Sequence, residues 1–262
     1  MQAAYYANLH GWIVVNVPRA IMWGKIVREI AMSTSRTGRV DLPIDASYWL
    51  GMFRTMNADL IEEYQIKTTQ SYNWSEWEST AEGESLMNVV DLGINRIKFA
   101  SDCVGVICKE LKNAARANKT KVLLCIDAVN NMFGVTRIKR EDKRLVPAKD
   151  VSLFHVFRKM MIPDWNNGAV VASVDMIAEG RRNFPDFKPV ALLKDEGFDL
   201  IDPFVPIHVP LYNDKEIDSV LDYYTAVNWI QNENAKTVDG RTQLKHLSGF
   251  NPHSLERLIA SA

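Results

Sequence analysis

The sequence predicts an α/β protein with a parallel sheet, followed by a small helical appendage. Short apolar runs alternate with longer segments in which apolar residues recur at helical spacing, which is the pattern of buried strands joined by crossover helices. After Pro210 the pattern is helical throughout. We therefore expect an α/β domain over residues 1–211 and a helical domain over residues 212–262.

The first residues predict the end of a helix followed by a buried strand. Residues 1–11 suit a helix that is closed by Gly11, and the apolar run 12–17 follows directly. No helix-capping residue and no recognisable targeting segment stand before them. We expect that an earlier strand of the sheet precedes this sequence.

The remaining elements follow from the same two patterns. Further strands are expected over residues 121–127, 168–174 and 204–209, with Pro206 marking an edge or a bend in the last one. Helices are expected over residues 47–63, 86–112 and 152–161 in the α/β domain, and over residues 214–231, 240–247 and 252–259 in the appendage.

Composition and charge exclude several classes of protein. The 262 residues carry a net charge of −1, so a protein that coats nucleic acid over its whole surface is excluded. No apolar run approaches the roughly 20 residues of a membrane-spanning helix. The three cysteines, Cys103, Cys108 and Cys125, form no C-x-x-C pair, so we expect no zinc site and a reducing compartment.

One strand ends in a residue that can orient a metal ion. The apolar run 122–126 is followed by Asp127, which matches the Walker B strand of P-loop nucleotide hydrolases, whose aspartate orients Mg²⁺ against phosphates. Ser173 would then occupy a polar sensor position at the end of the next strand. The alternatives are a turn cap for Asp127 and a serine that binds local backbone, and they remain open.

The phosphate-binding loop that should accompany this strand is missing. The sequence contains no G-x-x-x-x-G-K-[ST]; the nearest candidate, Gly24-Lys25, has Arg19 in place of the first glycine and Ile26 in place of Ser/Thr. Ala128 follows Asp127 where many hydrolases have a water-activating glutamate. Nucleotide occupancy is therefore better supported than turnover, and the question of enzyme activity stays open.

Several segments carry a family resemblance. Residues 126–161, together with 42–50, 74–83, 194–206 and 251–257, resemble the mitochondrial small-subunit ribosomal proteins of the death-associated-protein family, collinearly from about Gly11 onward. The resemblance implies an AAA-like P-loop domain with a C-terminal helical lid, truncated here before its first strand and phosphate loop. It also implies a structural place in the head of the mitochondrial small ribosomal subunit.

The resemblance assigns few residues. Asp127 matches the family's Walker B aspartate and the implied metal ligand, Ser173 the polar strand end, and Asn251-Pro252 the lid. It implies GTP or GDP with Mg²⁺ in the full-length protein but not in this chain, and a location in the mitochondrial matrix. The implied partners are ribosomal proteins and rRNA, without membrane or DNA. Family members are linked to apoptosis, which no residue here lets us derive.

Two basic segments are candidates for contact with RNA or acidic partners. One is a predicted helix face and the other lies in the long connection after Asp127; the alternative for both is a solvated charged surface. Their members are Lys109, Lys112, Arg116 and Lys119, and Arg137, Lys139, Arg140, Lys143 and Arg144.

Three functional hypotheses follow. The first is a structural ribosomal protein whose bound nucleotide, in the full-length protein, holds domain and lid together. The second is a switch that hydrolyses GTP or ATP and acts in signalling such as apoptosis, and Ala128 speaks against it. The third is a fragment without ribosome association.

Overall fold

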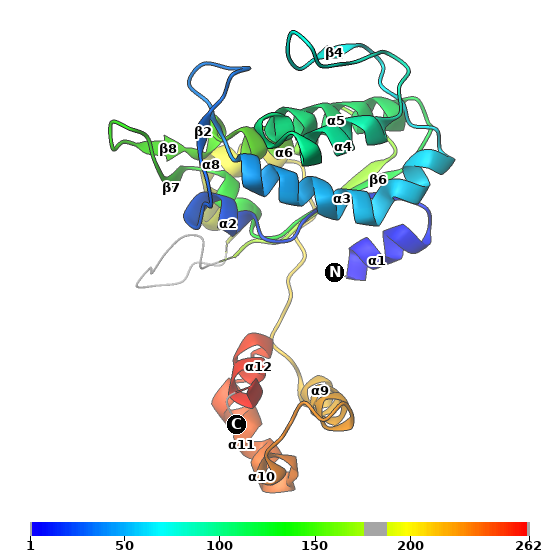
Figure 1. The fold of residues 1–262 in the computed structure, drawn as a ribbon. Helices are drawn as coiled ribbons and strands as arrows, with labels where there is room; N and C mark the ends of the chain where they lie inside the picture. Colours follow the sequence, from blue (N-terminus) through cyan, green and yellow to red (C-terminus); the bar gives the residue numbers. More distant parts are fainter. Residues whose placement is uncertain (1, 176–187, 261–262) are drawn as a thin grey trace. The chain divides into compact units, whose positions relative to one another are not determined.

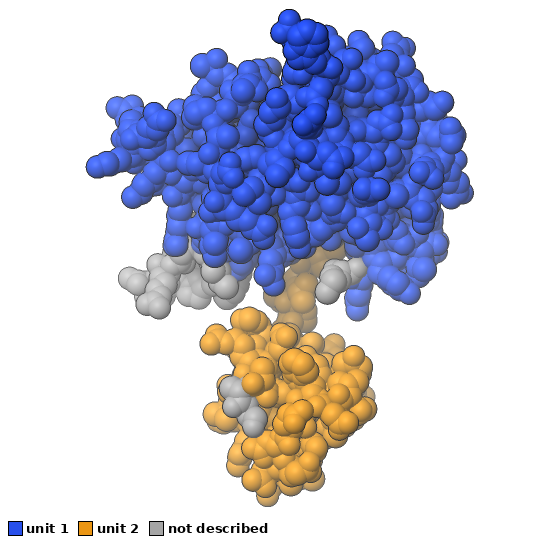
Figure 2. Space-filling model, in the orientation of Figure 1, with its two compact units in different colours: residues 1–204 blue, residues 205–262 orange. Residues whose placement is uncertain are grey.

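The structure is a computed structural model that describes residues 2–175 and 188–260. The chain divides into two compact units, unit 1 with residues Met1–Phe204 and unit 2 with residues Val205–Ala262 (Figure 2). Unit 1 consists of helices around a small sheet, and unit 2 consists of helices (Figure 1). The division of the chain into a nucleotide-binding domain and a lid stays a prediction.

A three-stranded parallel sheet forms the centre of unit 1. Its order is β1 (Ile13–Val17), β6 (Val122–Ile126) and β9 (Gly168–Ala172). Leu124 of the middle strand lies opposite Val15 on one side and Val170 on the other. β1 and β6 are composed mostly of buried aliphatic residues, as a strand covered on both faces requires. This confirms the prediction of an α/β protein with a parallel sheet.

Helices cover both faces of β1 and β6. Alternate side chains of these strands, such as Val15 and Leu124, pack in the main core with four helices, whereas Val14 and Leu123 point to the opposite face and pack against Ala7 of α1 (Gln2–Leu9). The four helices are α3 (Pro43–Glu63), α4 (Leu86–Asn95), α5 (Ala100–Arg116) and α6 (Ser152–Met161) (Figure 1). The alternation follows from the two-residue period of a strand.

The outer edge of β1 is closed by side chains of α3. The amide of Asn57, which is buried, accepts a hydrogen bond from the Val14 N–H at 2.8 Å and donates one to the Val14 carbonyl at 3.0 Å. The indole N–H of Trp49 donates to the Asn16 carbonyl at 2.8 Å. These bonds satisfy backbone groups that a further strand would otherwise pair.

Two predicted elements differ from the structure. The stretch 86–112 forms two helices rather than one, because the chain breaks after Asn95 and passes through the 3-10 helix η1 (Ile97–Phe99) before α5. The predicted strand 204–209 is wrong. Its apolar residues Val205, Ile207 and Val209 are more than 80% exposed, and no strand among the described residues pairs with it.

Short elements complete unit 1, and they lie in the connections that the sequence patterns left unassigned. The further elements are α2 (Ala20–Lys25), β2 (Ala31–Met32), β3 (Val40–Asp41), β4 (Tyr72–Asn73), β5 (Ser79–Thr80), η2 (Val129–Met132), β7 (Val135–Lys139), β8 (Leu145–Pro147), η3 (Ala148–Asp150) and α8 (Pro189–Ile201). Their strands form three two-stranded antiparallel pairs, β2 with β3, β4 with β5 and β7 with β8.

Unit 2 is a small helical bundle with its own core. Ile217, Leu221 and Leu255 are fully buried there. Asn213 caps the first helix in a capping box with Glu216. The helices are α9 (Asp214–Ala226), α10 (Glu233–Lys236), α11 (Val238–Ser248) and α12 (Pro252–Ala260). α9 ends five residues before the predicted end at residue 231, and α10 was not predicted, whereas α11 and α12 begin and end within two residues of the predicted spans. In the part of the chain that is described, no helix combines the length and the apolar character needed to cross a bilayer.

Candidate functional site

Two predicted site residues meet at the carboxyl edge of the parallel sheet. Asp127 directly follows β6, and Ser173 directly follows β9. The Ser173 hydroxyl donates a hydrogen bond to Asp127 Oδ1 at 2.5 Å, and both side chains are exposed. The parallel pairing of the two strands brings their polar ends together.

A tight turn after Asp127 fixes the position of the carboxylate. Ala128 adopts left-handed backbone geometry (φ 58°), and its N–H lies 3.4 Å from the Ser173 hydroxyl oxygen. The side chain of Asn130, which is buried, donates to the Asp175 carbonyl at 2.8 Å and accepts from the Asp175 N–H at 3.0 Å. The backbone beyond β9 is thereby tied to the turn.

Sequence reasoning missed the role of Asn130 and its neighbour. The Asn131 amide donates to the Ala20 carbonyl at 2.9 Å, which ties the turn to α2. The only sequence signal is the pair of asparagines that begins three residues after the strand-end aspartate, and asparagine is common in turns of every kind. These contacts join residues more than 40 positions apart, which no local pattern reports.

This edge of the sheet fits part of a nucleotide site. An exposed carboxylate beside a hydroxyl can orient the hydrated Mg²⁺ of a nucleotide. No cluster of three His, Cys, Asp or Glu side chains that could hold a metal by itself is found among the residues that the structure describes. Ala128 is 1% exposed and its methyl group accepts no proton, so the turn offers no general base beside Asp127.

The predicted lid residues lie in unit 2 and make contacts within that unit. The Asn251 side chain accepts a hydrogen bond from the Ser254 N–H at 3.1 Å, and its carbonyl accepts from the Leu255 N–H at 2.9 Å. Pro252 is the first residue of α12. Together these residues form the N-terminal cap of α12. Their assignment to nucleotide binding stays a prediction.

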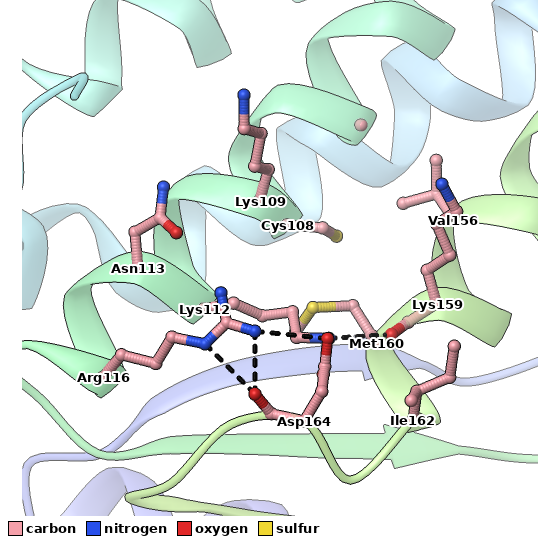
Figure 3. A pocket seen from close by; sticks show the side chains of 11 residues that line it. Cys108, Lys109, Lys112, Asn113, Arg116, Val156, Lys159, Met160, Ile162 and Asp164 are labelled. Carbon is pink, nitrogen blue, oxygen red and sulfur yellow. Dashed lines mark hydrogen bonds and ion pairs between the residues drawn. The ribbon is translucent and has the colours of Figure 1, made fainter. Parts of the chain in front are cut away.

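The predicted basic face of α5 forms one wall of a cavity of about 350 Å³ (Figure 3). Lys109, Lys112 and Arg116 line it from α5, and Lys159 lines it from α6. Lys119 lies beyond the end of α5 and is exposed outside the cavity. The structure therefore brings three of the four predicted residues together and adds Lys159, which was not predicted.

Asp164 holds two of these cations. The Lys112 ammonium donates to the Asp164 carboxylate and, at 2.9 Å, to the Lys159 carbonyl. Arg116 donates to the Asp164 carbonyl at 2.7 Å and to its carboxylate at 3.2 Å. The hydrogen bond from Lys112 lowers the pKa of Asp164, which therefore stays ionised at neutral pH. These contacts connect α5 to the end of α6.

The floor of the cavity is apolar. Val156 and Met160 of α6 contribute to it, together with Cys108 of α5. Burial raises the pKa of the Cys108 thiol to about 12, so Cys108 is protonated at neutral pH and is not poised as a nucleophile. The arrangement suits the binding of an anion rather than covalent chemistry.

The second basic segment forms the β7–β8 hairpin. Arg137 and Lys139 lie on its exposed face, and Lys143 stands in the turn. Arg140 instead donates to the Gly38 carbonyl at 2.8 Å and pairs with Asp150 at 3.0 Å, so it ties the hairpin to the loop between β2 and β3. Arg144 is highly exposed and forms a surface pair with Asp142 at 3.6 Å, a kind of pair that adds little stability.

A further cationic region, which sequence reasoning missed, adjoins α6. Arg39 donates a hydrogen bond to His155 Nε2 at 2.8 Å. Burial lowers the pKa of His155, and the nearby charges of Arg39, Lys159, Arg158 and Arg36, in that order of size, lower it as well, so that the pKa falls to about 4. His155 is therefore neutral at pH 7, and it lies among cations from both its own helix and the loop 33–39.

Comparisons with known proteins give a consistent relationship. The family model described as mitochondrial ribosomal death-associated protein 3 matches residues 1–258. The chain is 40% identical over 259 residues to the small ribosomal subunit protein mS29 of Mus musculus, covering 99% of this chain and 66% of the mouse protein. It is 39% identical over 256 residues to the protein of the same name from Bos taurus, covering 98% of this chain and 64% of that protein.

The chain thus spans slightly less than two thirds of the length of these curated relatives. The matched region includes both units and all of the site residues discussed above. The chain belongs to the mitochondrial ribosomal death-associated protein 3 family.

Proposed function

We propose that this chain is part of a structural protein of the mitochondrial small ribosomal subunit, located in the head of that subunit within the matrix. The observation that carries the proposal is the similarity to two proteins named as small ribosomal subunit proteins, which extends over at least 98% of the chain. Its partners are then rRNA and neighbouring ribosomal proteins. Membranes and DNA are not part of the proposal.

The carboxyl edge of the sheet supports a nucleotide site in the longer parent protein. GTP or GDP with Mg²⁺ would bind there, and the metal ion would neutralise phosphate charge. Asp127 would orient the hydrated metal ion, and the Ser173 hydroxyl, which donates to the Asp127 carboxylate, would hold that carboxylate in place. Since the sequence contains no phosphate-binding loop motif, we assign the nucleotide to the parent and not to this chain alone.

The exposure of β9 supports a larger sheet in the parent. Four of its five residues are exposed, and no described strand pairs with its outer side. Val170 and Val171 of β9 are 41% and 47% exposed. A strand from the parent that pairs with β9 would cover apolar surface of this kind.

We prefer a nucleotide that is bound as a structural element over one that is hydrolysed. The residue after Asp127 is a buried alanine, which cannot orient or deprotonate a water molecule. A bound nucleotide would therefore hold elements of the parent together without being turned over.

Sedimentation tests the structural role. A tagged form of this chain, directed to mitochondria, is expected to migrate with the small subunit in a gradient of mitochondrial lysate. A chain that stays at the top of the gradient while small subunits sediment normally would overturn the proposal.

The parent protein tests the nucleotide site. Asp127→Asn is expected to weaken Mg²⁺-dependent binding of GTP, measured by equilibrium dialysis, while binding of nucleotide in EDTA stays unchanged. Steady phosphate release by the parent that Asp127→Asn abolishes would contradict the preference for occupancy over turnover.

A further inference from the structure

The cavity between α5 and α6 has an excess of positive charge. Four cationic side chains line it, and Asp164 is the only carboxylate among its lining residues. The neighbouring Glu110 is directed away by hydrogen bonds from the Tyr72 hydroxyl and, at 3.0 Å, from the Thr69 hydroxyl. The Glu110 carboxylate therefore lies on the β4 side of α5 and does not line the cavity. The cavity attracts anions.

The four cations have different roles. Lys112, which is 9% exposed, and Arg116 are engaged with Asp164, and they connect the two walls of the cavity. Lys109 and Lys159 are exposed, and neither pairs with a carboxylate of any residue in the described ranges. Figure 3 shows both side chains extending from their helices away from Asp164. The Lys109 ammonium lies 5.6 Å from the centroid of the Tyr72 ring. Both ammonium groups can therefore bind a ligand without breaking an existing ion pair.

The spacing of the two walls is set before any ligand binds. The Lys112 ammonium bridges the Asp164 carboxylate and the Lys159 carbonyl at the end of α6. Arg39 and Arg36 lie close to His155 of α6, and the carboxylates of Asp150 and Asp41 lie near Arg39. The cations of the cavity come from two helices, so a ligand with several negative charges can contact more of them than a single small anion can.

We propose that the α5–α6 cavity binds the phosphate backbone of RNA, with Lys109 and Lys159 in direct contact with phosphate oxygens. Ammonium groups bind phosphates as point charges without base preference. Lys112, Asp164 and Arg116 act as positioning residues that connect the two walls and fix their spacing. The choice of RNA over an acidic protein rests on the ribosomal role proposed above.

Binding of a labelled single-stranded RNA by the chain tests the proposal. Lys109→Gln with Lys159→Gln is expected to weaken binding about tenfold in fluorescence anisotropy. The slope of log K against log salt should fall by about 1.4, which corresponds to two lost phosphate contacts on single-stranded RNA. The matched control, Lys67→Gln with Lys215→Gln, removes the same charge from exposed positions outside the cavity and should change binding less than twofold.

A conservative pair of variants separates charge from structure. Lys109→Arg with Lys159→Arg keeps both positive charges and is expected to retain RNA binding. Equal weakening by the cavity pair and by the control pair would overturn the proposal, as would unchanged binding by the cavity pair. A poly-glutamate peptide that displaces the RNA, and whose own binding requires the two lysines, would overturn RNA in favour of an acidic protein.

The sedimentation experiment keeps the two proposals apart. If the unaltered chain fails to join the small subunit but binds RNA through the two lysines, the cavity assignment stands and the ribosomal role fails. If the chain joins the subunit and the cavity pair binds RNA as the unaltered chain does, the ribosomal role stands and the cavity assignment fails.

Discussion

The two edges of the parallel sheet differ in whether side chains hydrogen-bond to their backbone groups. At the β1 edge, Asn57 and Trp49 hydrogen-bond Val14 and Asn16, and the strand is buried. At the β9 edge, four of five residues are exposed and no described strand or helix side chain performs the same task. The difference teaches that the first edge is a finished boundary of the sheet, whereas the second has the properties of an internal strand without its neighbour.

The largest effect is expected from Asn57→Leu. This substitution leaves the Val14 N–H and carbonyl buried without partners, so the free energy of unfolding should fall by about 3 kcal/mol. Denaturant titration followed by circular dichroism measures the change. Asn8→Ala removes a similar amide at an exposed position and should cost less than about 0.5 kcal/mol. An Asn57 variant of unaltered stability would mean that the β1 edge needs no capping.

A smaller effect is expected from Trp49→Phe. The phenyl ring keeps an apolar contact with the core, but the Asn16 carbonyl loses its donor, so the free energy of unfolding should fall by about 1–2 kcal/mol. The exposed Trp77 provides the control, since Trp77→Phe should leave stability within about 0.5 kcal/mol of the unaltered chain. Equal costs at the two positions would show that the indole N–H contributes nothing to the β1 edge.

The contribution to stability of the cationic region on α6 should depend on pH, whereas that of the β1 edge should not. The capping groups of Asn57 and Trp49 do not titrate, whereas the folded-state pKa of His155 lies near 4. Between pH 6.5 and pH 4 the unfolded chain binds a proton at His155 that the folded chain does not, so stability falls as the pH is lowered through this window.

His155→Gln should remove part of that acid-induced loss, by less than about 1 kcal/mol because His155 is partly exposed to solvent. The measurement is the melting temperature at pH 7 and at pH 5, and His208→Gln, at an exposed position, is the control. A histidine variant that loses as much stability in acid as the unaltered chain would assign the loss to other groups.

The smallest effect on stability, and a clear effect on association, is expected from Val171→Lys. Val171 is 47% exposed on β9, and a charge on an open strand discourages pairing with a second chain. Light scattering should show less self-association, with stability changed by less than about 0.5 kcal/mol. Val135→Lys adds the same charge at an exposed position of β7. If it reduces association equally, net charge and not the β9 edge is responsible.

The sequence predicts the elements whose patterns are local and strong. The apolar runs that became β1, β6 and β9 are unmistakable, and two of them end in Asp127 and Ser173, so the meeting of these residues follows from parallel topology alone. The pattern of residues 204–209 also predicts a strand, but a strand exists only where a partner pairs with it, and this segment has none among the described residues.

The contacts that sequence reasoning missed depend on distant residues. Asn57 looks like an ordinary polar residue on a helix, and its role becomes visible only when α3 lies against β1. Lys159 joins the cavity because α6 packs beside α5, and Asp164 decides which of the lysines remain available. Helical spacing identifies the basic face of α5, but it cannot separate cations that hold the fold from cations that can bind a ligand.

The burial of position 128 restricts the side chains that this position can accommodate. Ala128 is enclosed by protein, with its backbone in the left-handed region. A glutamate introduced there would place a carboxylate in a space that now holds a methyl group, and the desolvation of that charge would cost several kcal/mol. A carboxylate that could activate water therefore cannot be accommodated at position 128 unless the surrounding turn is rebuilt.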